Sequence, residues 1–219
     1  MVSTDPPLPR TLLVLAHETT RARTNNVREN RGSAVRLRAV TAAEAEAVCA
    51  GNRPSTGPAW HPEYPLDEDI RACGGFADRS AAGEHRDPFG YYQVILVGPE
   101  GEQVVGGAGF HGPPILDTVE VGYSVVPDRR GLGIATAALE LLLETAGRTG
   151  VDLVIGSTGV ADGHSRGVMS AAGMRPAGSD AGVCHFDWRP SSGAGAGGHP
   201  PSPGRPDGDR HTKTDHLSG

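Results

Sequence analysis

Lysine and long apolar runs are both scarce in this chain of 219 residues. Lys213 is the only lysine, so arginine carries almost all of the basic charge. The 20 basic and 26 acidic residues give a formal net charge of −6, and the basic residues form no stripe, which argues against a nucleic-acid partner. No apolar run reaches the roughly 18 residues of a membrane span, so no membrane insertion is predicted.

Cysteine is also rare, and its spacing excludes two further classes of site. Cys49, Cys73 and Cys184 are far apart and odd in number, and no C-x-x-C pair occurs. This pattern argues against a zinc site and against a disulfide framework. The apolar run at residues 11–16 is shorter than a secretory signal requires. A reducing cytoplasm is therefore the expected compartment.

The composition predicts one domain between two poorly ordered ends. Residues 190–219 are rich in glycine and proline and contain one large apolar residue, Leu217. Such a segment cannot bury enough surface to offset its ordering entropy, so we expect a disordered tail. Residues 1–32 are mostly polar and charged and are expected to form a loose arm. Residues 33–189 remain as one α/β domain.

Hydrophobic periodicity gives the order of elements in that domain. Alternation and buried apolar runs indicate strands, whereas spacings of three and four residues indicate helices. Thr41 and Glu44 form a capping-box pattern at one helix start. The expected strands cover residues 34–40, 91–97, 103–110, 119–126, 151–157 and 183–188, and the expected helices cover 42–50, 66–73, 134 to about 149, and 165–172.

The most informative segment is the glycine-rich turn at residues 127–136, which reads Pro-Asp-Arg-Arg-Gly-Leu-Gly-Ile-Ala-Thr. It joins a predicted strand to a predicted helix, so several free backbone N–H groups point at one place. The helix dipole favours negative charge there, which suits a pyrophosphate. Gly131 and Gly133 keep side chains away from that place.

Three other interpretations of this turn compete with a pyrophosphate cradle. A dinucleotide fingerprint would lie in the first strand–turn–helix unit, with an acidic residue about 20 positions later. This turn lies in the second half of the chain. A Walker loop needs Gly-Lys-Ser/Thr, which this chain lacks in the turn. The third alternative is an ordinary strand–helix turn.

Two motifs in the right order carry a resemblance to a known family. Residues 130–135, Arg-Gly-Leu-Gly-Ile-Ala, resemble the R/Q-x-x-G-x-G/A signature of the GNAT superfamily of acetyl-CoA-dependent N-acetyltransferases. Residues 162–174 resemble the N-x-x-S-x-x-V-L-x-x-x-G-F stretch of the same family. Ser165, Val168 and Gly173 match, Met169 and Met174 are apolar substitutes, and Asp162 replaces the usual Asn.

The resemblance implies a fold and a cofactor site. The fold is a mixed, mostly antiparallel sheet of six or seven strands, flanked by helices, whose central strands splay apart around acetyl-CoA. Asp162 and Ser165 would flank the pantetheine arm. The backbone would bind pantetheine at Ser124, Val125 and Val126, and would bind the pyrophosphate at Arg130, Gly131, Leu132, Gly133, Ile134, Ala135 and Thr136.

Glu120 is the candidate general base, because members of the family often carry a catalytic Glu on the corresponding strand. Alternation places Glu120, Gly122 and Ser124 on one face of that strand. His111 is a second candidate, since an imidazole suits proton transfer at neutral pH. The alternatives are a solvated strand glutamate and a surface-loop histidine.

The general acid is where the chain departs from the family pattern. Many members have a Tyr at the position of Ser170, aimed at the leaving sulfur. A serine is shorter and less acidic, so it could hold a water molecule but is a poor direct donor. Asp162 in place of Asn can accept a hydrogen bond from a cofactor amide but cannot donate one.

The acceptor is predicted only as a primary amine, on a small molecule or at a peptide or protein N-terminus. Residues 120–125 and 130–136 most resemble the ribosomal-protein N-terminal acetyltransferase (RimJ/RimL-like) branch, which also contains enzymes acting on antibiotics and other small amines. The acidic, aromatic residues 60–69 could attract a cationic amine, or could be a packed loop. The chain is expected to be a monomer or homodimer. A non-catalytic, regulatory acyl-CoA-binding relative is the alternative function.

Overall fold

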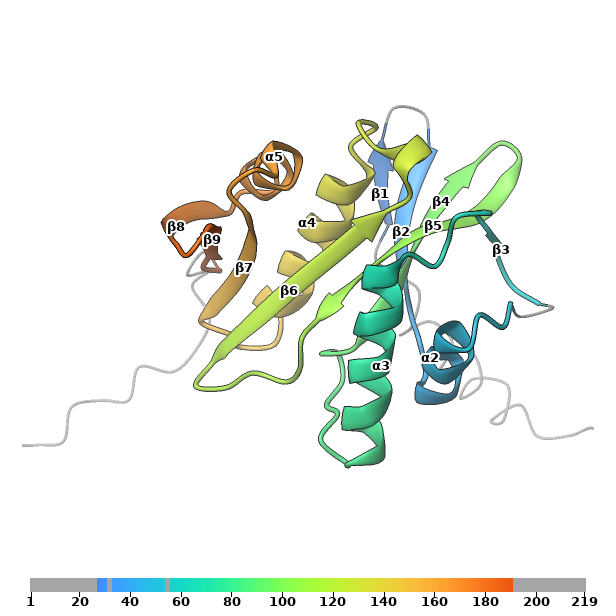
Figure 1. Ribbon diagram of the computed structural model, residues 1–219, viewed down its shortest axis with the longest axis horizontal. Coiled ribbons are helices and arrows are strands. Elements are labelled where there is room, and N and C mark those ends of the chain that lie inside the picture. The colour runs from blue at the N-terminus through green and yellow to red at the C-terminus, as the bar shows by residue number, and fades with distance from the viewer. Residues whose placement is uncertain (1–26, 31–32, 54–55, 191–219) are drawn as a thin grey trace, which may run out of the picture.

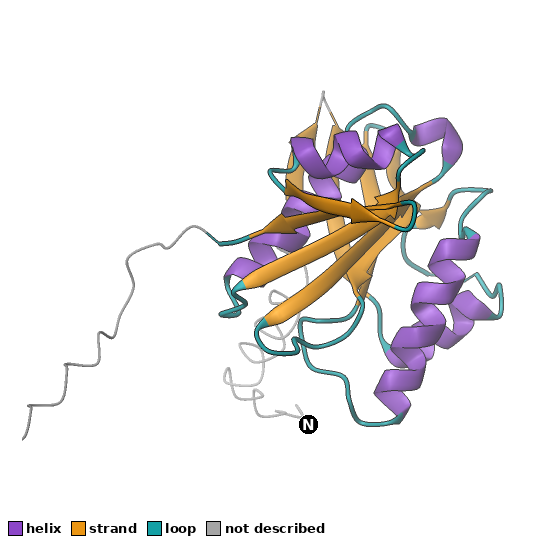
Figure 2. Cartoon of the chain, turned by 60° about the vertical axis from the view of Figure 1, so that its left-hand side comes forward, coloured by secondary structure: helices purple, strands orange, loops and turns teal. Residues whose placement is uncertain are grey.

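The computed structural model describes residues 27–30, 33–53 and 56–190. They form a twisted sheet with helices on both of its faces (Figure 1, Figure 2). The elements are β1 (Val27–Asn30), β2 (Ser33–Ala39), α2 (Ala42–Cys49), β3 (Ala59–Trp60), α3 (Asp67–Ala81), β4 (Tyr91–Gly98), β5 (Gly101–Phe110), β6 (Thr118–Val125), the 3-10 turn η1 (Pro127–Arg129), α4 (Ile134–Gly147), β7 (Leu153–Gly159), α5 (Gly163–Ala171), β8 (Arg175–Asp180) and β9 (Val183–Trp188).

The sheet has nine strands in the order β1-β2-β4-β5-β6-β7-β9-β8, with β3 beside β5. All of its pairings are antiparallel except β3 with β5 and β6 with β7. The predicted fold class is therefore confirmed, but six or seven strands was too few. Neither β8, whose six residues are all exposed, nor the two-residue β3 has the apolar alternation that would predict a strand.

The N-terminal edge of the sheet also differs from expectation. Residues 27–30, which we assigned to a loose arm, form β1 and pair antiparallel with β2. Pairing with an existing strand supplies the hydrogen bonds that a polar segment cannot provide for itself. The rest of the predicted arm and the tail from residue 191 lie outside the described residues.

The central strands β6 and β7 form a fork. They pair in parallel over three positions only, from Thr118 with Leu153 to Glu120 with Ile155. Beyond Glu120, β6 continues along β5 while β7 turns away to pair with β9. Figure 1 shows the two strands meeting at one end and diverging toward α5. The predicted splay of the central strands is thus present, and its vertex is at Glu120.

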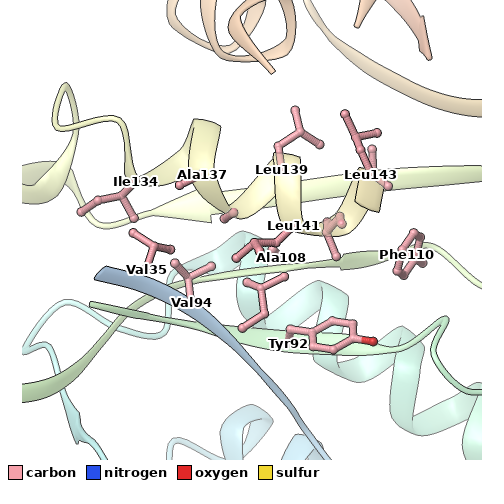
Figure 3. Packing of buried hydrophobic residues seen from close by; sticks show 14 of the residues in the cluster. Val35, Tyr92, Val94, Ala108, Phe110, Ile134, Ala137, Leu139, Leu141 and Leu143 are labelled. Carbon is pink, nitrogen blue, oxygen red and sulfur yellow. The ribbon is translucent and has the colours of Figure 1, made fainter. Parts of the chain in front are cut away.

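Helix α4 forms the centre of the main core. Its predicted apolar stripe, residues 134, 137, 138, 141 and 142, is buried throughout. Figure 3 shows Ile134, Ala137 and Leu141 directed at the strands, with Leu139 and Leu143 directed the other way. Those two leucines are also buried. A helix that is apolar on nearly every side must be covered on nearly every side, and α4 lies between the sheet and α5.

The opposite face of the sheet is covered by α2 and α3, which lie in front of it in Figure 1. A second, smaller core packs there, including Val48, Cys73 and Phe76. Helix α3 runs to Ala81, eight residues beyond the predicted end at residue 73. Gly74 and Gly75 follow the predicted end but lie inside the helix, where packing outweighs their low helix propensity. Among the described residues, no helix is both long and apolar enough to cross a membrane.

Candidate active site

The main chain of β6 faces two different neighbours. His111 N–H donates to Glu120 O at 2.9 Å, and Val126 N–H donates to Val105 O at 2.9 Å. Because the hydrogen-bonded pairs alternate along an antiparallel ladder, the even-numbered residues of β6 direct their main-chain groups at β5. The odd-numbered residues, Val121, Tyr123 and Val125, direct theirs at the opening of the fork.

This polarity bears on the expected pantetheine contacts, which stay a prediction. Ser124 was expected to bind through its backbone, but it pairs with Gly107 of β5. Val126 was expected to do the same, but its N–H is used by β5 and its carbonyl accepts from Arg129 N–H at 3.0 Å. Of the three predicted residues, only Val125 directs its main chain at the fork. Sequence alternation identifies the side-chain faces of a strand but not which edge its amides serve.

The glycine-rich turn has the geometry of an anion cradle. Gly131 and Gly133 have φ of +73° and +77°, the left-handed region that favours glycine. The first helical hydrogen bond of α4 runs from Ala137 N–H to Gly133 O at 3.0 Å. The N–H groups of residues 134–136 precede that bond, so they have no acceptor within the helix. A Cβ built on Gly131 would meet no atom within 4 Å, so the turn is open to an approaching group.

Arg130 stands beside the cradle and contributes less of its backbone than expected. Its N–H donates to Pro127 O at 3.2 Å, which closes the η1 turn. Its side-chain Nε donates to Val125 O at 2.9 Å, so the guanidinium is held at the end of β6. A cation fixed there complements the helix N-terminus in attracting a negative ligand. The predicted contacts of residues 131–136 with a pyrophosphate stay a prediction.

Asp162 and Ser165 satisfy one another at the start of α5. Asp162 is the N-cap and accepts from the Ser165 backbone N–H at 3.0 Å and from Ser165 Oγ at 2.7 Å. These bonds, the backbone one first, lower the pKa of the Asp162 carboxyl. An aspartate is as good a helix cap as the asparagine it replaces. Contact of either residue with a cofactor stays a prediction, as does a catalytic role for Ser170, which is exposed on α5.

Tyr123 reaches from β6 to α5. Its hydroxyl donates to the carbonyl of Ser165 at 3.1 Å, and burial raises its pKa to about 12. Its main-chain groups face the opening of the fork, as described above. A phenol that keeps its proton over the whole physiological pH range therefore spans the fork between its two sides.

The two candidate bases lie together at the vertex of the fork. His111 Nδ1 is 3.4 Å from Glu120 Oε2, and Ser157 Oγ is 3.5 Å from Glu120 Oε1. The imidazole lies over Gly122, because a Cβ built there would be 2.8 Å from His111 Nε2. His111 lines a cavity on this face of the sheet, whereas Glu120 stands behind it. The structure thus pairs two residues that the sequence offered as alternatives.

That cavity has a volume of about 410 Å³ and lies between α3 and strands β5 and β6. One face of α3 forms its wall through residues 68, 72, 75 and 79, the three- and four-residue spacing of a helix face. Glycines clear its floor. A Cβ on Gly107 would be 2.0 Å from Tyr91 Oη and 2.3 Å from Asp69 Oδ1, so only glycine allows those two side chains to lie on the sheet.

Asp69 is the buried acid of the cavity. It is 1% exposed and accepts hydrogen bonds from Ser124 Oγ at 2.5 Å, Tyr91 Oη at 2.9 Å and Leu66 N–H at 2.9 Å. Burial raises its pKa, and these three bonds oppose that effect. Residues 60–69 were expected to contribute acids to an acceptor site, and Asp69 does line the cavity. The network around it was not foreseen, because it joins residues 55 positions apart.

His61 connects the segment after β3 to the turn η1. Its Nε2 is 3.1 Å from Asp128 Oδ2 in η1, and its Nδ1 accepts from Glu63 N–H at 3.2 Å. His61, Glu63 and Asp128 bring three possible metal-ligand atoms within 4.8 Å of one another. Both imidazole nitrogens already have protein partners, however. We therefore interpret the His61–Asp128 contact as a structural link between the β3 segment and η1, not as a metal site.

The comparisons with known proteins agree with this architecture. The acetyltransferase (GNAT) domain family matches residues 34–175. A GNAT-family acetyltransferase from Bacillus anthracis is similar in structure, with 18% identity and a TM-score of 0.50 over 74% of this chain and 98% of that one. RimJ of Mycobacterium smegmatis, solved with CoA-disulfide, has 22% identity and a TM-score of 0.49 over 76% of this chain and 86% of that one.

A ribosomal-protein-S5-alanine acetyltransferase from Vibrio fischeri has 13% identity and a TM-score of 0.49 over 76% of this chain and 97% of that one. No curated protein sequence matches this chain. At such identities the structural likeness concerns the fold alone, whereas the family match covers more than half of the chain. The chain therefore belongs to the GNAT family of acetyltransferases.

Proposed function

We propose that this protein transfers the acetyl group of acetyl-CoA to a primary amine by direct attack, without an acyl-enzyme. The main observation in support of this proposal is that three features lie along β6. The open edge of the strand faces the fork, the anion cradle follows its C-terminal end, and the His111–Glu120 pair stands at the fork's vertex. The cavity on the α3 face provides a separate entrance for the acceptor.

The chain offers acetyl-CoA a continuous set of backbone donors and acceptors. The N–H groups at the start of α4 bind the pyrophosphate, with Arg130 beside them. The main-chain groups of Val121 and Tyr123 and the N–H of Val125, whose carbonyl already accepts from Arg130, bind the pantetheine arm as an added strand would. A β6 amide facing the fork stabilises the oxyanion that forms on the acetyl carbonyl, since a fixed donor in a low-dielectric site is effective for developing charge. Acetyl-CoA supplies the activated acyl group and a thiolate leaving group.

His111 accepts the proton of the attacking amine in this proposal. Its Nε2 lies over Gly122 on the cavity floor, and its Nδ1 lies 3.4 Å from a Glu120 carboxylate oxygen. In this proposal the carboxylate orients the ring and stabilises the imidazolium. Glu120 therefore acts behind the histidine and not in direct contact with the acceptor. This assignment follows from which of the two side chains lines the cavity.

Two hydroxyl groups are available to protonate the departing sulfur. Ser170 occupies the position where family members often have Tyr. Tyr123 reaches across the fork from the opposite strand, and its raised pKa keeps the proton on the phenol. We assign the stronger role to Tyr123, because its hydroxyl is already held between β6 and α5. Tyr123→Phe should reduce kcat more than Ser170→Ala, with little change in the KM for acetyl-CoA.

The decisive experiment measures thiol release from acetyl-CoA against a panel of primary amines, with mass spectrometry of the products. His111→Gln should lower kcat by about 10²-fold or more, the usual contribution of a positioned base. Glu120→Gln should lower it less. Glu100→Gln, an exposed turn residue, is the matched control for Glu120→Gln.

A non-catalytic acyl-CoA-binding relative would behave differently in the same assay. It would bind acetyl-CoA by calorimetry and release no thiol with any amine. Loss of turnover in His111→Gln with acetyl-CoA affinity retained would reject that alternative. Equal activity of the wild type, His111→Gln and Glu120→Gln would reject the assigned base.

A further inference from the structure

We propose that the cavity under α3 selects an acceptor that carries an anionic group, carboxylate or phosphate, a few bonds from its primary amine, and that Arg79 binds this anion. The inference rests on the proposed function, because it assigns the amine to the acceptor side of that reaction. It goes further in naming the substrate class and the residue that recognises it.

Arg79 is a half-buried cation that has no acidic partner within the described part of the chain. Its side chain lines the cavity, and among the described residues it forms no side-chain hydrogen bond or ion pair. Two arginines of β2 differ in this respect: Arg36 pairs with Glu102, and Arg38 pairs with Glu44. A guanidinium keeps its charge and five N–H donors at any physiological pH, so its unmet demand inside a cavity is best met by a bound carboxylate or phosphate.

Two glycines leave space for the Arg79 side chain. A Cβ built on Gly75, one turn earlier in α3, would be 3.3 Å from an Arg79 terminal nitrogen. Gly112 lies on the loop that follows β5, and a Cβ built there would be 3.6 Å from Arg79 Nε. The Arg79 side chain therefore lies in a slot between the helix and this loop. A side chain at either glycine would narrow that slot.

The slot adjoins the group assigned to proton removal. Gly112, whose missing Cβ would lie 3.6 Å from Arg79 Nε, directly follows His111, and consecutive Cα atoms are about 3.8 Å apart. His111 and Arg79 both line the cavity. An acceptor whose amine faces His111 thus needs its anion only a few bonds away, as in an amino acid or in phosphoethanolamine. A longer spacer would carry the anion past the guanidinium.

The rest of the cavity limits the remainder of the acceptor. Its other end carries Glu68, the buried Asp69 and Arg71, whose terminal nitrogen is 4.0 Å from a Glu68 carboxylate oxygen. Two acids and one cation that already has an acidic neighbour do not favour a second anion there. Its volume of about 410 Å³ falls in the range of small-molecule sites. The cavity therefore suits a small acceptor with one anion near its amine, oriented by Arg79 at one end and by the acids at the other.

The test uses pairs of probes that differ only in the anion. Glycine is compared with glycinamide, L-alanine with L-alaninamide, and O-phosphoethanolamine with ethanolamine, each by thiol release from acetyl-CoA. We expect the wild type to favour the anionic member of the carboxylate pairs, the phosphate pair, or both, by at least tenfold in kcat/KM. For the carboxylate pairs this preference opposes intrinsic reactivity, since the carboxamide has the less basic amine and more free base at neutral pH.

Arg79→Gln should reduce that ratio at least tenfold, and Arg79→Lys should restore part of it. Arg175→Gln is the control for loss of one positive charge, because Arg175 is exposed on β8 and does not line the cavity; its ratio should equal that of the wild type. Circular dichroism and melting temperature report whether each variant is folded. If Arg79→Gln does not fold, the wild-type ratios and Arg79→Lys decide the question.

The possible failures are distinguishable. If the protein only hydrolysed acetyl-CoA, or acetylated none of the amines tested, the proposed function would be overturned. Transfer to neutral and anionic members at equal rates, or an equal ratio in Arg79→Gln and Arg175→Gln, would overturn this inference and leave the acetyltransferase function standing. Faster transfer to peptides with amidated C-termini than to any small anionic amine would also overturn it, in favour of a peptide N-terminus.

Discussion

The two faces of the sheet in this protein are built by different interactions. On one face, α4 packs with buried leucines, alanines and Ile134 against the strands (Figure 3). On the other, α3 covers a hydrogen-bonded group around the buried Asp69 and a floor of glycines. The first face is held by apolar area removed from water. On the second, Asp69, Tyr91 and Ser124 are held together by hydrogen bonds, which offset the cost of burying their polar atoms.

This difference separates stability from selectivity. The α4 face positions the anion cradle at the start of its helix and needs no polar group in its interior to do so. The α3 face contains a cavity, and the cavity exists because glycines replace side chains and a carboxylate replaces apolar packing. Changes on the first face should therefore act mainly on the free energy of unfolding, and changes on the second should act on acceptor use as well.

The largest expected effect is on the α4 face. Leu141→Ala removes a side chain that is 1% exposed in the main core and should lower the free energy of unfolding by about 3 kcal/mol or more. Urea denaturation followed by circular dichroism measures it. Leu116→Ala, at a position that is 93% exposed, is the control and should change stability by less than about 0.5 kcal/mol.

A substitution on the α3 face should have a smaller but more specific effect. Gly107→Ala places a methyl group where Tyr91 and Asp69 now lie, and overpacking of this kind costs about 1–3 kcal/mol. Gly159→Ala in β7 is the matched control, since a Cβ there meets no atom within 4 Å. Equal melting temperatures for the two variants would show that the Asp69 network tolerates displacement and would weaken the contrast between the faces.

The cradle can be tested by a pair of glycines with the same backbone conformation. Gly133 and Gly150 have φ of +77° and +78°, so Gly133→Glu and Gly150→Glu impose similar strain and the same charge. Only Gly133→Glu puts a carboxylate at the N-terminus of α4, where it would compete with a bound anion. We expect acetyl-CoA to bind Gly133→Glu at least about tenfold more weakly by calorimetry, and Gly150→Glu to bind as the wild type does.

The smallest effect near neutral pH concerns the tyrosines. Burial raises the pKa of all four, to about 12 for Tyr92 and Tyr123 and further for Tyr64 and Tyr91. A folded pKa above the unfolded value near 10 means that stability is unchanged below about pH 10 and falls as the pH rises above it. Phenolate absorbance should therefore appear together with unfolding at alkaline pH. A phenolate signal near pH 10 in a folded protein would contradict this burial.

The parts that the sequence predicted are those encoded by neighbouring residues. The cradle glycines, the apolar stripe of α4, and the capping box at Thr41 are local patterns, and the structure contains all three. The succession of strands along the chain followed from the same periodicity, apart from β1, β3 and β8. The fork was expected only through the family resemblance, since no local pattern reports where two parallel strands separate.

The parts that the sequence could not predict depend on distant residues. The Asp69–Ser124 bond and the His61–Asp128 contact each join segments more than 50 residues apart. Arg79 lies beyond the predicted end of its helix, because two consecutive glycines resemble a helix terminus. Alternation in the sequence predicts which side chains of β6 share a face of the sheet. Which of its main-chain groups point at β5 and which at the fork could be assigned only from the observed pairing with β5.

In the proposed complex, the side chains and the main chain of strand β6 would serve different ligands. An acceptor approaching from the α3 side would meet Gly122 and Ser124, which line the cavity, whereas the coenzyme arm would meet main-chain groups, which every amino acid possesses. Under this proposal, mutations on the cavity side of the strand would alter which amine is accepted without changing how the acyl donor is bound. A scaffold with that separation can acquire new acceptors one residue at a time.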